Sequence, residues 1–103
     1  MSKKIVLFCN AGMSTSLLVN KMKAAAKELD FDCEIDAYST GQEKEYGKDA
    51  DVILLAPQVR YHLKKVQSIF PDKPIAIIEM MDYGRVDGMN VLKTALNLLE
   101  DDK

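Results

Sequence analysis

The 103-residue sequence has no tryptophan, one histidine, three prolines and only two cysteines. Two cysteines do not make the disulfide framework of a small secreted domain, and the apolar run Ile5–Cys9 is too short for an export signal. No apolar run approaches the roughly 20 residues that cross a bilayer. The net charge of −2 excludes the basic excess typical of nucleic-acid binding. We therefore expect a cytoplasmic protein with reduced thiols and no nucleic-acid partner.

Short β-rich runs alternate with longer helical periods, which is typical of an α/β fold with a parallel sheet. The length suits one domain, 1–103. The polar stretch 39–50 predicts a crossover with a short helical turn, and residues 79–88 predict a loop. The patterns predict strands at 5–8, 33–38, 52–56 and 75–78, and helices at about 14–29, 59–70 and 92–99.

The two most apolar strands, 5–8 and 52–56, belong in the centre of the sheet. With right-handed crossovers this predicts a three-layer, doubly wound sheet of four parallel strands in the order 2-1-3-4. Ligands of such sheets bind beyond the carboxyl ends of the strands, at the point where the strand order reverses. That point lies beside Cys9, at the end of the first strand.

A loop of small and hydroxyl residues follows Cys9. Its backbone amides can converge on one spot and, with the positive end of the next helix, form an anion site. Gly12 gives conformational freedom, Ser14 or a neighbouring residue is a natural N-cap, and the same donors favour the thiolate of Cys9. We expect Cys9 to be a nucleophile in front of a phosphate-binding loop. The loop residues are Asn10, Ala11, Gly12, Met13, Ser14, Thr15 and Ser16.

The loop lacks the cation of a cysteine phosphatase. In the pattern Cys-x5-Arg the guanidinium clamps the phosphoryl group, but the sixth position after Cys9 is Thr15, and the first arginine is Arg60. A site with a nucleophile and phosphate-binding amides, but without this arginine, does not favour hydrolysis. It suits a phosphocysteine that persists until a second protein accepts the phosphoryl group. A hydrolase related to low-molecular-weight tyrosine phosphatases remains the alternative, with Asp82 as a possible general acid.

These residues carry a family resemblance. The segments Cys9–Val19, Ala50–Val52, Ala56–Val59 and Tyr83–Gly88 resemble the IIB subunit of the phosphoenolpyruvate-dependent sugar phosphotransferase system, lactose/cellobiose (chitobiose) type. The resemblance covers nearly the whole chain, and residues 39–50 match least well.

The resemblance implies a phosphotransferase component. Cys9 would accept a phosphoryl group from a phosphohistidine of the IIA protein. It would pass this group to a sugar held by the membrane permease IIC, with which the chain would associate. A β-linked disaccharide such as cellobiose is the implied sugar, and neither a metal nor a cofactor is implied.

Other candidate residues have plainer interpretations. Cys33 opens the second strand, too far from Cys9 for a disulfide, and is expected to be a packing residue. His62 is expected to be an exposed or half-buried helical residue, since one histidine and two distant cysteines do not form a zinc site. Gln58 is expected at the rim of the site. Four methionines could surround Cys9 or fill the core: Met13, Met80, Met81 and Met89.

Overall fold

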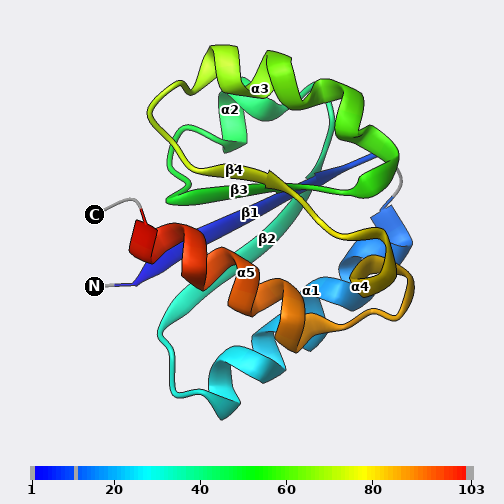
Figure 1. The fold of residues 1–103 in the computed structure, drawn as a ribbon, viewed down its shortest axis with the longest axis vertical. Coiled ribbons are helices and arrows are strands. Elements are labelled where there is room, and N and C mark those ends of the chain that lie inside the picture. Colours follow the sequence, from blue (N-terminus) through cyan, green and yellow to red (C-terminus); the bar gives the residue numbers. More distant parts are fainter. Residues whose placement is uncertain (1, 11, 102–103) are drawn as a thin grey trace.

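The computed structural model describes residues 2–10 and 12–101, with the side chains of these residues apart from 12–14 and 101. Figure 1 shows a sheet with helices on both faces. The strands are β1 (Lys3–Cys9), β2 (Cys33–Ser39), β3 (Val52–Leu55) and β4 (Ile75–Ile77). The helices are α1 (Gly12–Glu28), α2 (Glu43–Tyr46), the 3-10 helix η1 (Pro57–His62), α3 (Leu63–Ile69), α4 (Met80–Gly84) and α5 (Gly88–Asp101).

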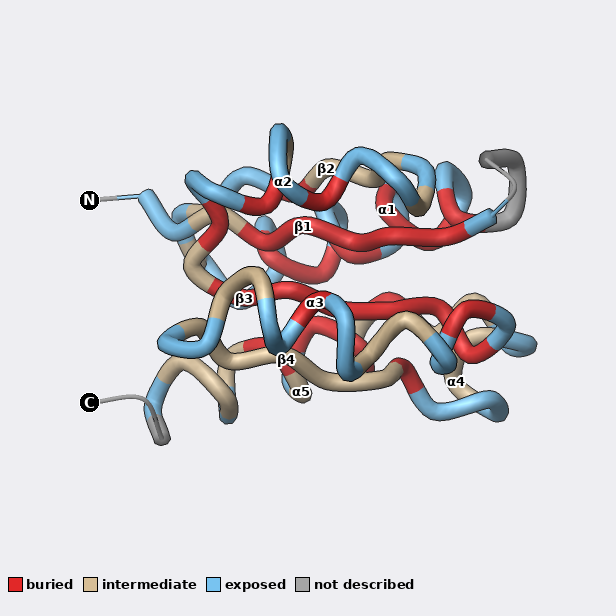
Figure 2. Tube along the Cα trace, turned by 90° about the horizontal axis from the view of Figure 1, so that it is seen from above, coloured by how far each residue is buried: buried red, intermediate tan, exposed pale blue. Residues whose placement is uncertain are grey.

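The sheet is parallel, in the order β2-β1-β3-β4, which confirms the predicted topology. Ile5 on β1 pairs with Ile35 on β2 and with Val52 on β3, and Ile53 on β3 pairs with Ile75 on β4. The two central strands are buried along most of their length (Figure 2), as their continuous apolar sequences predict.

Alternation along β1 separates two hydrophobic cores. Ile5 and Leu7 pack with residues of α1 and α5, which cover one face of the sheet, and Val6 and Phe8 pack on the opposite side. That opposite side is covered by α2, η1 and α3 (Figure 1). Cys9, at the end of the strand, belongs to the same cluster as Phe8. This arrangement leaves the carboxyl edge of the sheet to the loops and helix starts.

The structure corrects three local expectations. The first helix begins at Gly12 rather than near residue 14, so Ser14 lies inside α1 and is not its N-cap. Residues 79–88 are not all loop, because α4 occupies Met80–Gly84. Five residues are too few to show a helical period, which explains the wrong prediction. The helix predicted at 59–70 starts earlier, as a 3-10 helix at Pro57, and becomes α-helical only from Leu63.

None of the helices in the described part of the chain is long and apolar enough to cross a membrane.

Candidate functional site

Cys9 is the last residue of β1 and lies at the carboxyl edge of the sheet. Its register partner on β2 is Ser39, and its carbonyl oxygen accepts a hydrogen bond of 3.0 Å from the Thr40 amide. Only 3% of the residue is exposed. Because α1 begins at Gly12, the thiol-bearing residue stands three positions before the first residue of a 17-residue helix.

The expected phosphate loop is shorter than the sequence indicates. Asn10 is exposed and forms a bend, while Gly12 to Ser16 already belong to the first turns of α1. The first four amides of a helix have no partner within the helix, so in α1 they are the candidates for the donors that the prediction assigned to a loop. Ala11 lies outside the described residues, as do the side chains of Gly12, Met13 and Ser14.

Thr15 and Ser16 have different surroundings. Thr15 is fully buried, and its hydroxyl lies 3.0 Å from the hydroxyl of Tyr83 on α4. Ser16 is exposed and lines a cavity together with Cys9. The Thr15 side chain therefore joins α1 to α4, whereas the Ser16 side chain faces the candidate site.

The cavity beside Cys9 has a volume of about 200 Å³. Cys9 and Ser16 form one wall, and the end of β2 with the following turn forms the other. Pockets for drug-sized ligands are larger, at roughly 300–1,000 Å³. The cavity therefore has room for a small group attached to the thiol. The residues of the second wall are Ala37, Tyr38, Ser39 and Gln42.

The methionines divide between surface and core. Met80 and Met81 on α4 are 69% and 62% exposed, whereas Met89 is half-buried and packs against the core that contains Leu7. The contact between Thr15 and Tyr83 ties α4 to the start of α1, so the two exposed methionines belong to the same edge of the molecule as Cys9.

Two further candidate residues, Gln58 and Asp82, follow the ends of β3 and β4, and neither lines the cavity beside Cys9. Gln58 is exposed in η1, directly after the end of β3. Asp82 lies half-buried on α4, and its Oδ1 accepts a hydrogen bond of 3.3 Å from the Asn90 side-chain amide. This bond ties the Asp82 carboxylate to α5, which gives no support to a role for Asp82 as a general acid.

The sequence gives no hint of a buried carboxylate in α2. Glu43 is only 2% exposed, and its Oε1 accepts a hydrogen bond of 2.8 Å from the Gly41 amide. Its Oε2 lies 3.6 Å from Nδ1 of His62, which is half-buried as expected. Glu43 therefore links the turn after β2 to η1. An acidic residue in a polar segment carries no sequence signal of such burial.

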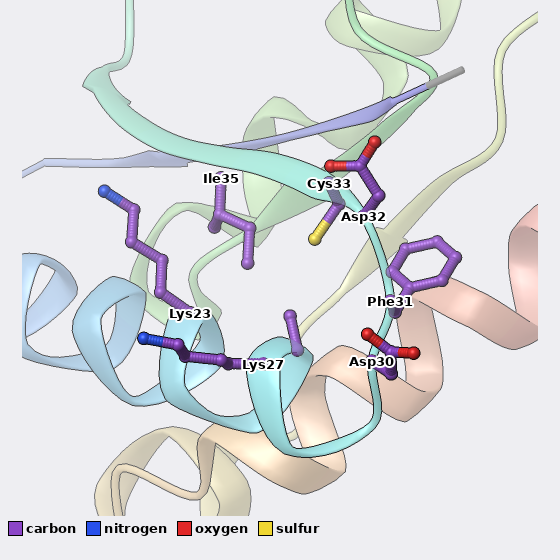
Figure 3. A pocket seen from close by; sticks show the side chains of 8 residues that line it. Lys23, Lys27, Asp30, Phe31, Asp32, Cys33 and Ile35 are labelled. Atoms are coloured by element: carbon purple, nitrogen blue, oxygen red, sulfur yellow. The ribbon is translucent and has the colours of Figure 1, made fainter.

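Cys33 lies in a different environment, at the amino end of β2 (Figure 3). It lines a cavity of about 340 Å³ with Lys23 and Lys27 of α1 and with Asp32. Burial, and secondarily the Asp32 carboxylate, raise the pKa of the Cys33 thiol. The residue packs against the core of α1 and α5. A raised pKa makes a thiol a poorer nucleophile near neutral pH, in line with the expected packing role.

Comparison with known proteins gives a consistent result. Residues 4–94 match the model of the family described as "PTS system, Lactose/Cellobiose specific IIB subunit". The oligo-beta-mannoside-specific EIIB component of Bacillus subtilis (strain 168) is 39% identical over 99 residues, covering 94% of this chain and 96% of that protein. The galactose-specific EIIB component of Lactococcus lactis subsp. cremoris is 42% identical over 104 residues, with the same shares covered.

A solved structure agrees with these sequence relatives. The solution structure of the cellobiose-specific phosphotransferase IIB component from Borrelia burgdorferi has a TM-score of 0.83 and 38% sequence identity. The match covers 100% of this chain and 96% of that one.

Proposed function

Because the chain belongs to the lactose/cellobiose-specific IIB subunits of the sugar phosphotransferase system and so is a phosphoryl carrier, we propose that Cys9 is the residue that carries the phosphoryl group. One observation supports this assignment above all. Cys9 ends a central strand directly before the start of α1 and opens onto a small cavity. Residues 1–103 act as a single IIB domain in this proposal.

The cradle consists of backbone amides more than side chains. A phosphoryl group on the Cys9 sulfur lies in front of the first turn of α1, where unpartnered amides and the helix dipole favour negative charge. In this proposal residues 10–16 bind the phosphoryl group, with backbone donors from the first four amides of α1, and the Ser16 side chain lies on the cavity wall. Thr15 contributes through its backbone amide, because its hydroxyl contacts Tyr83.

Two transfers complete the reaction. In the first, the Cys9 sulfur attacks the phosphorus of a IIA phosphohistidine, so that an S–P bond forms, the N–P bond breaks and the thiol proton ends on the imidazole. In the second, a sugar hydroxyl attacks the same phosphorus. An O–P bond then forms, the S–P bond breaks and the hydroxyl proton ends on the Cys9 sulfur. Both steps need positioning and charge stabilisation rather than a metal or cofactor.

The site favours transfer over hydrolysis. A cysteine phosphatase needs an arginine at the sixth position after its nucleophile, and this position holds the buried Thr15. The Asp82 carboxylate is held by Asn90. The phosphocysteine therefore awaits the second protein, the permease IIC, and the domain works beside the membrane that contains it.

We propose a β-linked disaccharide such as cellobiose as the sugar. The relatives named for oligo-beta-mannoside and cellobiose support a β-linked substrate, and the relative named for galactose leaves the individual sugar open to test. In this proposal the permease holds the sugar, so sugar selection belongs to the permease.

The test is reconstituted sugar phosphorylation. The chain is combined with phosphoenolpyruvate, the general phosphotransferase proteins, a IIA protein and vesicles containing the permease, and supplied in turn with cellobiose, a β-mannobiose and galactose. We expect phosphorylation of the β-linked disaccharides and none with Cys9→Ser. Hydrolysis of p-nitrophenyl phosphate by the isolated chain, without transfer to any sugar, would instead identify a phosphatase.

A further inference from the structure

The cavity beside Cys9 has a polar residue in the wall opposite α1 that the phosphate loop does not include. Gln42 lines this cavity. It comes four residues after Tyr38, the residue of β2 that pairs with Phe8. It lies in the turn between β2 and α2 and thus faces Cys9 and Ser16 from the β2 side. The start of α1 can donate hydrogen bonds to a group on Cys9 from one side of the cavity only. A donor from the opposite side would have to lie in the β2 wall, where Gln42 is.

The amide of Gln42 has a defined orientation. Its Oε1 accepts a hydrogen bond of 3.1 Å from the Ser39 backbone N–H, and its own backbone N–H donates to the Ser39 carbonyl at 3.2 Å. A backbone N–H can only donate, so the oxygen must be the end of the amide that faces Ser39. The NH2 group is therefore the end of Gln42 that is left to interact with a ligand in the cavity.

The turn that carries Gln42 is anchored on both sides. The Thr40 amide donates to the carbonyl of Cys9 at 3.0 Å, and the Gly41 amide donates to the buried carboxylate of Glu43 at 2.8 Å. Gly41 has a φ of 98°, a left-handed conformation that favours glycine. The turn is thus fixed to the nucleophile's own backbone, and a donor on it needs little reorganisation to meet a group on the sulfur.

We propose that Gln42 is a further phosphoryl-binding residue, whose side-chain NH2 donates a hydrogen bond to an oxygen of the phosphoryl group on Cys9. The proposal rests on the phosphocysteine function above. The phosphoryl oxygens then have donors on two sides, from the start of α1 and from the turn after β2. Gln42 takes no proton in either transfer and acts only on the charge of the oxygens during the exchange at phosphorus.

Gln42→Glu distinguishes donation to the phosphoryl group from the hydrogen bond that the Gln42 side chain accepts from Ser39. A carboxylate keeps the acceptor for the Ser39 N–H, but it loses the donor and brings a negative charge against the phosphoryl group. Gln42→Met removes the donor without adding charge, and it also removes the amide oxygen that accepts from the Ser39 N–H. Gln67→Glu, on the exposed surface of α3, is the matched control for the charge change. Thermal unfolding of each variant shows that the fold is kept.

The measurement is the single-turnover rate of Cys9 phosphorylation by a phosphorylated IIA protein, followed by rapid quench and intact-protein mass spectrometry. We expect the saturated rate to fall about tenfold or more in Gln42→Glu and Gln42→Met, with Gln67→Glu at the wild-type rate. A wild-type rate in either Gln42 variant, or an effect only on the IIA concentration needed for half-saturation, would overturn the role of Gln42. Absence of phosphocysteine in the wild type would instead overturn the proposed function itself.

Discussion

At the scale of single residues, Cys9 and Cys33 differ in position and surroundings. They lie on neighbouring strands, but Cys33 pairs with Lys3, six positions from Cys9 along β1, which is roughly 20 Å. Cys9 is next to the start of a long helix, whereas Cys33 lies beside the Asp32 carboxylate. Burial first, and the Asp32 carboxylate second, oppose ionisation of the Cys33 thiol, so its surroundings do not suit a nucleophile.

Cys33 is expected to be dispensable for transfer. Burial, and secondarily the Asp32 carboxylate, raise the pKa of its thiol, so the rate of its alkylation by iodoacetamide should keep rising with pH beyond the ordinary cysteine value of roughly 8.5. Cys33→Ala should support sugar phosphorylation at the wild-type rate. Loss of transfer in a folded Cys33→Ala protein would contradict the assignment of Cys33 to packing.

At the scale of elements, the start of α5 packs against the backbone of α1. Gly88 is buried there, and a Cβ at this position would lie 2.5 Å from the carbonyl carbon of Lys21 and 2.6 Å from the backbone nitrogen of Met22. Backbone atoms cannot yield as a flexible side chain can. Gly88 thus sets how closely the two helices of this face approach each other.

Gly88→Ala should destabilise the protein by about 1–3 kcal/mol, because the helices must move apart to admit the methyl group. Urea unfolding gives the free energy of unfolding directly. The matched control is Gly84→Ala, where an added Cβ has no neighbour within 4 Å and the expected change is within about 0.5 kcal/mol. Equal stability of the two variants would refute this close packing.

At the scale of the whole molecule, exposed apolar side chains gather toward one edge. Met80 and Met81 lie on the helix that follows β4, and Leu17 lies in the second turn of α1, which follows β1. These elements begin at the carboxyl edge of the sheet, where Cys9 lies. If Cys9 carries the phosphoryl group as proposed, its sulfur meets a donor and an acceptor in turn, and adaptable methionines suit a surface that binds two partners.

Replacing both Met80 and Met81 by serine should raise the half-saturating concentration of phosphorylated IIA by about tenfold, since buried apolar contacts at an interface are lost. The saturated transfer rate should change little. Leu29→Ser is the control, because Leu29 is an exposed apolar residue just beyond the other end of α1. If Leu29→Ser weakened IIA binding as much as the double variant, the docking surface would lie elsewhere.

The sequence predicts the sheet well because its strands carry strong patterns. Val52–Leu55 is apolar throughout and is buried on both faces, and Cys33, Ile35 and Ala37 share a face as their alternation indicates. The turn containing Gln42 and the burial of Glu43 are not predictable in this way. They depend on contacts between segments distant in the chain, such as Glu43 with His62 and Thr40 with Cys9.

The start of α1 shows the same limit at the site. A run of small and hydroxyl residues looks like a loop, but Gly12 to Ser16 are helical, and Thr15 is buried against Tyr83 from a segment 68 residues away. The proposed anion site does not depend on a loop, because the first turn of a helix also offers amides without a partner in the helix.

The most direct test of Cys9 as carrier is to map the phosphoryl group. The chain is incubated with phosphoenolpyruvate, the general phosphotransferase proteins and a IIA protein, then digested under conditions that preserve phosphocysteine and analysed by peptide mass spectrometry. The account predicts one phosphoryl group, on Cys9, absent from Cys9→Ser and retained in Cys33→Ala. A phosphoryl group on any other residue, or undiminished labelling of Cys9→Ser, would contradict it.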